Sequence, residues 1–513
     1  MRRFVLPVLK ETPWLAGVVA GWALLWIQGR AFVLGETPLG FGWWDYLMLT
    51  WHRIHPIAGQ GGSWRNPLYL AWVEWLGRDL GYADAAVIIS SISVYLLVFS
   101  TGFTGRMLGS TGVGALAALS IPLVRTTAEA SRWMTLYPPL AAVSGIAVTV
   151  ALALALRPHA ALALATGAVT GLAWALDWRG LLMVVPVGLL TAVAVVRTPR
   201  RRWLPPLLVL AGLGVGPLGI LGLGGTDLLP VKAQVEEQAQ VVRRWMATTR
   251  DPALARDCLA LPEANRSGLP YLGSTCPKTL LVHNLTHDFP REMPFGLLPT
   301  LVLLPLVLLP GKRGWTGLVT SGAAVAVPMA LLLASALWIL LPDRYILHFA
   351  GITALVVPLG LSRLARTALP RRWGPGLEVV LLVAAGIWLL RVGPPDRDRR
   401  TKMEMNEDIQ MAGHTRAALQ AYLGPDDRLL DCSETHMEPL FLPRLLHSGP
   451  PMLSHVEEAR CAAWDQAPDT GGWTSWLLTG ANNVPENPAW EEVFSTDGHG
   501  KQAKLWRLRP AAE

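Results

Sequence analysis

Long uninterrupted apolar runs constrain this chain more than any other feature of its sequence. Several are about 18 residues or longer, the length that an α-helix needs to cross the hydrocarbon core of a bilayer. Of the 513 residues, 52% are hydrophobic and only 16% are charged, a balance too apolar for an ordinary soluble domain. The 23 Trp residues suit a protein with many membrane–water interfaces, where the indole ring is favourably placed. The sequence therefore predicts an all-α polytopic membrane protein.

The apolar runs divide into about eleven predicted membrane spans. The first follows the basic start MRRFVLPVLK. It is interpreted as a retained span and not as a secretory signal, because it is long and no small-residue cleavage site follows it. The predicted spans are 13–34, 85–104, 111–128, 137–156, 160–176, 180–196, 204–223, 296–310, 315–340, 345–361 and 375–392.

Basic residues determine the predicted orientation, because Lys and Arg accumulate in cytoplasmic loops. If the N-terminus is inside, the cytoplasmic loops hold RTPRRR (197–202) and SRLARTALPRR (362–372), whereas Asp and Glu gather on the other side. The net charge of +7 therefore indicates orientation and not nucleic-acid binding. We predict a multi-pass protein of the cell inner membrane with a cytoplasmic N-terminus and a periplasmic C-terminal domain.

Three segments on the predicted outer side are long. Segment 35–84 contains two amphipathic stretches, WWDYLMLTWHRI and NPLYLAWVEWLGRDL, which we expect to form helices along the membrane surface. Segment 224–295 is a large polar loop, and the transmembrane module extends over 1–392. Segment 393–513 is predicted to be a small soluble α/β domain, with a helix over 404–422, a strand in DRLLDC and a β-hairpin around the Asp-Gly of EEVFSTDGHGKQAKLWRL.

All four cysteines fall in these outer segments. An oxidising compartment would permit the disulfides Cys258–Cys276 and Cys432–Cys461. Four free thiols are the alternative.

Charged side chains beside apolar spans are functional candidates, because burying a charge near lipid is costly. The alternative is that each one anchors a span end by extending to the headgroups. Those in LDWRGL and LPDRYIL stand out, because they occupy short hairpins between apolar neighbours. The candidates on the predicted outer side are Asp45, His52, Arg53, His55, Arg65, Glu129, Arg132, Asp177, Arg179, Asp343 and Arg344.

A carboxylate and several arginines on one outer face suit group transfer from a lipid phosphate. Guanidinium groups bind phosphate oxygens in a bidentate fork, and a general base must deprotonate the acceptor. Asp45 is the candidate base, and the aromatic faces of its neighbours Trp43, Trp44 and Tyr46 suit stacking on a sugar ring. The alternative for Asp45 is a cap of a surface helix over 46–54.

One sequence motif contains two histidines of the kind that bind metals. His52 and His55 of HRIH lack a clear third ligand, so we predict no metal-binding residues. The cofactor is left open, since a carboxylate beside a phosphate also suits a divalent cation.

Six motifs follow one another in a characteristic order. They are WWDYLMLTW, RNPLYLAWVEWLGRDLG, TGRMLGSTGVGALAALSIPL, EASRWMTLYPPLAA, ALDWRGLLMVVP and PDRYILHFAGITALVVPLGL, followed by the soluble C-terminal segment. Over residues 1–370 this order resembles the membrane-embedded GT-C glycosyltransferases, in particular the branch with bacterial aminoarabinose transferases and protein O-mannosyltransferases.

The resemblance implies transfer of a sugar from a polyprenyl-phosphate donor on the outer face of the membrane, with Asp45 as the catalytic acidic residue. It implies that the donor phosphate is held by Arg344, Arg132 and Arg179. The residues predicted to contact substrate are Trp43, Trp44, Tyr46, His55, Arg65, Tyr137, Asp177 and Tyr345. The chain departs from the family where Tyr46 follows Asp45 in place of a second acidic residue, which leaves metal dependence and the acceptor open.

Two other functional classes remain as alternatives to a glycosyltransferase. An oligosaccharide ligase or polymerase of the cell envelope would use the same outer arginines to move a whole oligosaccharide. A non-catalytic scaffold or a transporter is the third class, although a transporter would place charges near the bilayer midplane and here they lie at span ends. The predicted partners are membrane lipids, the polyprenyl-phosphate sugar and an acceptor that is a lipid, glycan or protein, with no nucleic acid.

Overall fold

The computed structural model describes most of the apolar part of the chain and part of the C-terminal segment. The described residues are 2–31, 33–34, 37–38, 67–80, 82–124, 127, 130, 135–199, 203–222, 285, 289, 293–310, 314–335, 346–370, 372–392, 414–415, 417–419, 421–422, 429–432, 476–479, 485, 488–498 and 501–508.

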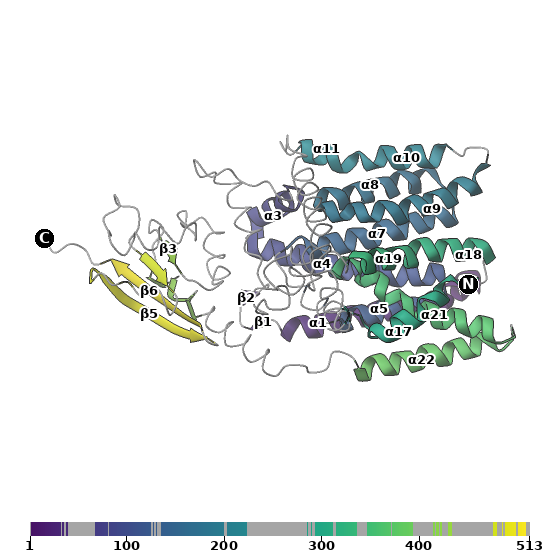
Figure 1. Ribbon diagram of the computed structural model, residues 1–513. Coiled ribbons are helices and arrows are strands. Elements are labelled where there is room, and N and C mark those ends of the chain that lie inside the picture. The colour runs from purple at the N-terminus through teal and green to yellow at the C-terminus, as the bar shows by residue number, and fades with distance from the viewer. Residues whose placement is uncertain are drawn as a thin grey trace, which may run out of the picture.

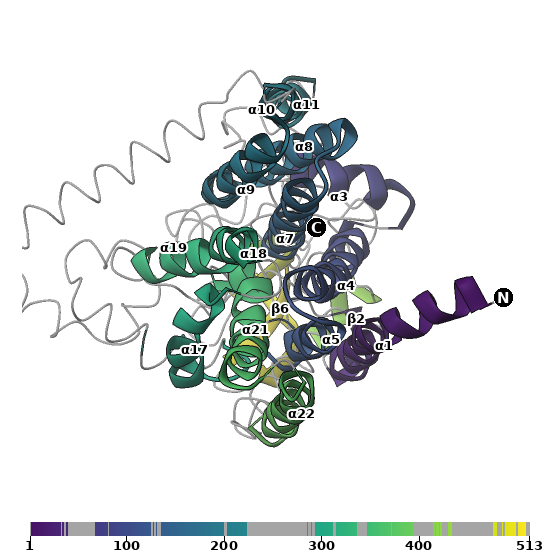
Figure 2. The same cartoon turned by 90° about the vertical axis from the view of Figure 1, so that its right-hand side faces the viewer.

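A bundle of roughly parallel and antiparallel helices forms the main body of the molecule (Figure 1). Viewed along its axis, α7 lies near the centre, with α4, α5 and α1 on one side and α8 to α11 on another (Figure 2). The α-helices are α1 Arg2–Ala31, α3 Pro67–Leu80, α4 Tyr82–Leu108, α5 Thr111–Ser120, α7 Tyr137–Leu156, α8 Ala160–Leu176, α9 Val184–Arg197, α10 Leu204–Leu213, α11 Val215–Gly222, α17 Leu297–Leu303, α18 Gly314–Ser321, α19 Val327–Ser335, α21 Ala350–Ala368 and α22 Gly374–Val392.

Short irregular turns join or interrupt these helices. The 3₁₀ segments are η1 Ile121–Leu123, η2 Trp178–Met183, η6 Pro305–Leu308 and η8 Leu347–Phe349. A π turn, η7 Gly322–Ala326, separates α18 from α19.

Six helical segments within the described residues are long and apolar enough to cross a membrane, which makes this a multi-pass membrane protein. They are Ala85–Leu108, Tyr137–Leu156, Arg179–Arg197, Gly314–Ser335, Leu347–Ala368 and Gly374–Arg391. Five shorter apolar helices coincide with the other predicted spans, namely Glu11–Ile27, Thr111–Leu123, Ala160–Leu176, Leu204–Gly219 and Leu297–Leu308. The full count of eleven spans stays a prediction.

Glycines let three of these helices approach one another closely. A Cβ on Gly167 or Gly171 of α8 would lie 2.0 or 2.4 Å from the carbonyl oxygens of Val209 and Leu213 in α10. A Cβ on Gly216 of α11 would lie 2.0 Å from the carbonyl oxygen of Gly171. Because lipid tails are as apolar as the side chains, such backbone-to-backbone packing supplies much of the attraction between membrane helices.

Polar side chains join several predicted cytoplasmic turns at one end of the bundle. The carboxylate of Glu378 in α22 accepts hydrogen bonds of 2.7 Å from Ser110 before α5, from Ser362 of α21 and from Arg366 of α21. Arg106 at the end of α4 makes charge-assisted hydrogen bonds to both carboxylate oxygens of Glu11 in α1, at 2.6 and 2.8 Å. We call the Glu378 group with Ser110, Ser362 and Arg366 the inner-end network.

Helix α3 confirms that one of the two predicted amphipathic stretches is helical, and its place along the membrane surface stays a prediction. Tyr69 and Val73 are buried on one face, whereas Trp75 is 75% exposed on another. Arg78 pairs with Glu74 one turn earlier at 2.8 Å. Burial raises the pKa of the Tyr69 hydroxyl above its ordinary value. The other predicted surface helix lies outside the described residues.

The C-terminal segment contains a four-stranded sheet, which lies at the end of the bundle away from the N-terminus (Figure 1). Its order is β3-β4-β6-β5, with β3 Leu429–Cys432 parallel to β4 Trp476–Thr479 and the rest antiparallel. A two-stranded ribbon, β1 Val33–Leu34 and β2 Thr37–Pro38, follows α1.

The predicted hairpin is confirmed as β5 Trp490–Gly498 and β6 Lys501–Leu508. Asp497 pairs with Gln502 and Gly498 with Lys501, so the predicted turn residues Asp-Gly belong to the end of β5 instead. The predicted strand is β3, and the described residues 414–415, 417–419 and 421–422 of the predicted helix are helical. The indole N–H of Trp506 donates to Thr479 Oγ1 at 2.9 Å in the buried face.

Candidate functional site

Three of the predicted site residues are described, and they come together. Tyr137 opens α7, while Asp177 and Arg179 lie between α8 and α9. The other predicted site residues lie outside the described residues: Asp45, Trp43, Trp44, Tyr46, His55, Arg65, Arg132, Arg344 and Tyr345. The cysteine candidates Cys258, Cys276 and Cys461 do too, and Cys432 ends β3, so both disulfides stay predictions.

The turn Asp177–Gly180 is built by its own side chains. Asp177 ends α8 in an extended conformation, and its carboxylate accepts a 2.8 Å hydrogen bond from the backbone N–H of Arg179. Position 180 requires glycine, because a Cβ there would lie 2.2 Å from the carbonyl oxygen of Ala173. An Asp that caps a short helix in this way fixes the direction in which the chain enters the next helix.

The Arg179 guanidinium is held by the same carboxylate. Arg179 Nη1 lies 3.4 Å from each oxygen of Asp177, and the two side chains are 17% and 5% exposed. A largely buried cation with a counter-ion on one side is held in one orientation. The carboxylate of Asp177 is therefore engaged in positioning Arg179, a role that the sequence motif did not specify.

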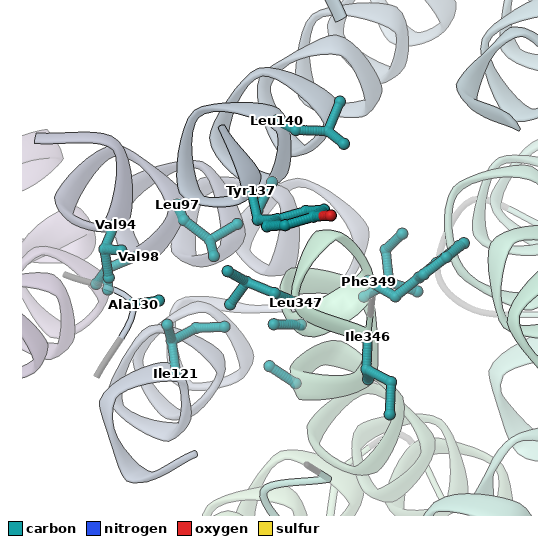
Figure 3. Close-up of a cluster of buried hydrophobic side chains, with 14 of the residues drawn as sticks. Val94, Leu97, Val98, Ile121, Ala130, Tyr137, Leu140, Ile346, Leu347 and Phe349 are labelled. Atoms are coloured by element: carbon teal, nitrogen blue, oxygen red, sulfur yellow. The ribbon is translucent and has the colours of Figure 1, made fainter. Parts of the chain in front are cut away.

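Tyr137 forms the neighbouring wall of this site. The Arg179 guanidinium carbon lies 5.7 Å from the centroid of the Tyr137 ring, within the range of a cation–π contact. Figure 3 shows Tyr137 beside Leu347, with its hydroxyl pointing away from Leu97 and toward the side on which Phe349 lies. Tyr137 is 6% exposed, and η8 packs against α7 at this point.

His348 is a site residue that the sequence analysis missed. It lies in η8, is 6% exposed, and its ring centroid is 4.1 Å from that of Phe349. Its neighbour Leu347 lies beside Tyr137, the ring over which the Arg179 guanidinium lies (Figure 3). A signal was available, because His348 is an ionisable residue within the apolar run of PDRYILHFAG, and such residues in membrane spans are usually functional.

These residues form what we call the outer-end site: Tyr137, Asp177, Arg179 and His348. They come from three sequence segments, and each lies at a helix terminus that the predicted orientation places on the outer side. A guanidinium with a fixed counter-ion and an apolar, aromatic wall can bind an anionic group such as a phosphate. Within the described ranges, no three His, Cys, Asp or Glu side chains are grouped so as to hold a metal ion.

Comparison with solved structures finds similar membrane proteins, whereas no family model and no curated protein sequence matches the chain. The oligosaccharyltransferase of Archaeoglobus fulgidus is 12% identical, with 91% of this chain and 69% of that chain covered and a TM-score of 0.44. ArnT from Cupriavidus metallidurans bound to undecaprenyl phosphate is 13% identical, with 97% and 98% covered and a TM-score of 0.45. AglB from A. fulgidus in complex with an inhibitory peptide and a dolichol-phosphate is 12% identical, with 91% and 69% covered and a TM-score of 0.43.

The structures found are an oligosaccharyltransferase and ArnT, and the chain is similar to them over most of its length. At this identity and these TM-scores, the similarity carries no residue role and no activity to this chain. Those are argued below from its own residues.

Proposed function

We propose that this protein is a membrane glycosyltransferase that moves a sugar from a polyprenyl-phosphate donor to an acceptor on the outer face of the membrane. The observation that carries the proposal is the outer-end site, where Arg179 is held by Asp177 beside the aromatic ring of Tyr137. The Arg179 guanidinium is oriented and largely shielded from water. Such a group suits a lipid phosphate, because the phosphate is anionic and arrives from the membrane.

The proposed mechanism uses a general base for the acceptor and a group of arginines for the departing phosphate. Asp45 deprotonates the acceptor nucleophile, which attacks the anomeric carbon of the sugar as the bond to the lipid phosphate breaks. Arg179, with Arg344 and Arg132, stabilises the negative charge that develops on the departing phosphate. Trp43, Trp44 and Tyr46 would stack on the sugar, and His55, Arg65 and Tyr345 would complete its contacts.

We propose that the long outer segments determine which acceptor the enzyme binds. Segments 224–295 and 393–513 would shape the entrance for the acceptor, since both belong to the predicted outer side. The sugar and the acceptor class (lipid, glycan or protein) are left to experiment. The cysteine pairs Cys258–Cys276 and Cys432–Cys461 would stabilise these outer segments in an oxidising compartment.

The test is turnover by purified protein in detergent or nanodiscs. We expect wild type to release undecaprenyl phosphate or dolichol phosphate from one member of a panel of polyprenyl-phosphate sugars. Asp45→Asn should lower kcat by at least about 100-fold, as expected for loss of a general base. Arg344→Ala should raise the KM for the donor and lower kcat.

Two outcomes would redirect the proposal. Full activity of the Asp45→Asn protein would make Asp45 a helix cap and place the base elsewhere. Turnover only with lipid-linked oligosaccharides would favour the ligase or polymerase, whereas no turnover with either panel would favour a scaffold or transporter.

A further inference from the structure

His348 is a buried imidazole for which the fold provides no hydrogen-bond partner among the residues that the structure describes. Both ring nitrogens are buried, and neither has such a partner. Leaving a polar group buried and unpaired costs free energy, so such groups usually have an explanation in function or in a bound ligand. His348 lies at the outer-end site, which makes a bound ligand the natural explanation.

The surroundings of the imidazole limit the chemistry of that ligand. Leu347, the neighbour of His348, lies beside the Tyr137 ring over which the Arg179 guanidinium lies, so a ligand bound at His348 is close to a cation (Figure 3). An imidazole carries at least one N–H in either protonation state and can therefore always donate one hydrogen bond. The ligand atom that suits both groups is an anionic oxygen.

The apolar side of the pocket strengthens such a contact. The ring of Phe349 lies against the imidazole at 4.1 Å between centroids, and Tyr137 lies beside Arg179. Hydrogen bonds to an anion are stronger where aromatic groups exclude water. The sequence also places His348 four residues after Arg344, the other proposed phosphate ligand in this segment.

We propose that His348 binds the phosphate group of the lipid-linked donor, donating a ring N–H to a phosphate oxygen that Arg179 also contacts. This inference rests on the proposed function, since it names a residue of the same site. It adds to the arginines a further hydrogen-bond donor, the imidazole of His348, which can donate in its neutral and in its charged form.

The experiment measures binding of undecaprenyl phosphate to the full-length protein in nanodiscs. Undecaprenol, which lacks the phosphate, and inorganic phosphate are measured beside it. The variants are His348→Phe, which keeps an aromatic ring, His348→Gln, which keeps an N–H donor, and Arg179→Ala, which removes the guanidinium. His159→Gln is the matched control, because His159 is an exposed histidine at the start of α8, at the other end of the bundle.

We expect His348→Phe to weaken undecaprenyl phosphate binding about tenfold, as for loss of one hydrogen bond to a charged group. His348→Gln should recover most of this affinity, and His159→Gln and undecaprenol binding should be unchanged. Without ligand, His348→Phe should melt at the same temperature as wild type or higher, since an apolar ring replaces an unpaired polar one. A purely structural histidine would give a lower melting temperature instead.

The outcomes separate this inference from the function on which it rests. If His348→Phe binds undecaprenyl phosphate like wild type while Arg179→Ala does not, the His348 inference fails and the phosphate site stands. If wild type binds undecaprenol as tightly as undecaprenyl phosphate, both fail. A loss that is equal for inorganic phosphate assigns the site to any free phosphate, and a loss confined to the lipid assigns it to the lipid headgroup.

Discussion

At the scale of single residues, Asp177 makes two interactions that substitutions can separate. Its carboxylate caps η2 through the N–H of Arg179 and also faces the Arg179 guanidinium. Asn is as good a cap as Asp but carries no charge, whereas Ala removes both interactions. The two substitutions therefore distinguish local folding from the orientation of Arg179.

We expect Asp177→Asn to lower the melting temperature, because the largely buried Arg179 cation loses its counter-ion, and to raise the KM for the lipid donor. Asp177→Ala should destabilise the protein by about 1–2 kcal/mol more, through loss of the cap. Melting in detergent and donor KM are the two measurements. An unchanged KM in both variants would mean that the orientation of Arg179 does not matter for the donor.

The sequence predicted single residues of the site as far as local motifs allow. Asp177 and Arg179 could be proposed because charges in a short hairpin between spans are unusual, whereas Tyr137 was proposed only through the motif EASRWMTLYPPLAA. His348 was missed, because its importance comes from being buried where η8 packs against α7, and Tyr137 of α7 lies 211 positions away in the sequence. Such a contact is a property of the tertiary structure and leaves no local pattern.

At the scale of helices, close packing between α8 and α10–α11 depends on glycine. Gly171 has no room for a Cβ, whereas Gly188 on α9 has nothing within 4 Å of the position that a Cβ would occupy. Both are glycines within helices, so they form a matched pair. Their substitution tests the packing and not the helical propensity.

Gly171→Leu should therefore lower the melting temperature strongly or prevent folding, because the helix backbones must separate. Gly188→Leu should leave the melting temperature unchanged or raise it slightly, since Leu is a better helix former than Gly. Thermal melting of both proteins in the same detergent is the measurement. Equal melting temperatures would contradict the close approach of α8 to α10.

The inner-end network offers a second test at this scale. Glu378 is 4% exposed and holds Ser110, Ser362 and Arg366. Glu378→Ala leaves the Arg366 cation without its partner, and breaking a buried ion pair in this way costs about 3–5 kcal/mol. Ser110→Ala, which removes one of the hydrogen bonds, should cost only about 1 kcal/mol.

Melting temperatures of the two network variants provide the comparison. A Glu378→Ala protein as stable as the Ser110→Ala protein would show that the ion pair contributes little. Donor KM should be unaffected in both, because the network lies at the opposite end of the bundle from the outer-end site.

Periodicity and hydropathy predicted where most helices lie, but not where they break. The span predicted over 137–156 is α7 to the residue, because Pro138 and Pro139 mark its start and charged Arg157 follows its end. The span over 204–223 is instead divided into α10 and α11 at Gly214, and the span over 315–340 contains the π turn η7. Such interruptions follow from contacts with neighbouring helices, which hydropathy does not measure.

At the scale of the whole molecule, segments predicted to share one side of the membrane meet at one end of the bundle. Hydrogen bonds join Glu11 to Arg106 and Ser110 to Glu378, so the N-terminal, α4–α5 and α21–α22 turns meet at one end. Each of these turns was predicted to be cytoplasmic. The C-terminal sheet lies at the other end (Figure 1).

Reporter fusions decide which end faces the cytoplasm. A reporter that is active only outside the cytoplasm should give signal when fused after Pro395 and none when fused after Arg202. The opposite pattern would overturn the orientation and the assignment of the site to the outer face.

The most direct test of the central claim is where a lipid phosphate binds in the bundle. We would label the protein with a photoreactive undecaprenyl phosphate and map the modified peptides by mass spectrometry, with photoreactive undecaprenol as the control. The account predicts phosphate-dependent labelling near Tyr137, Arg179 and His348. Labelling concentrated around Arg106 and Arg366, or equal labelling by the undecaprenol analogue, would contradict it.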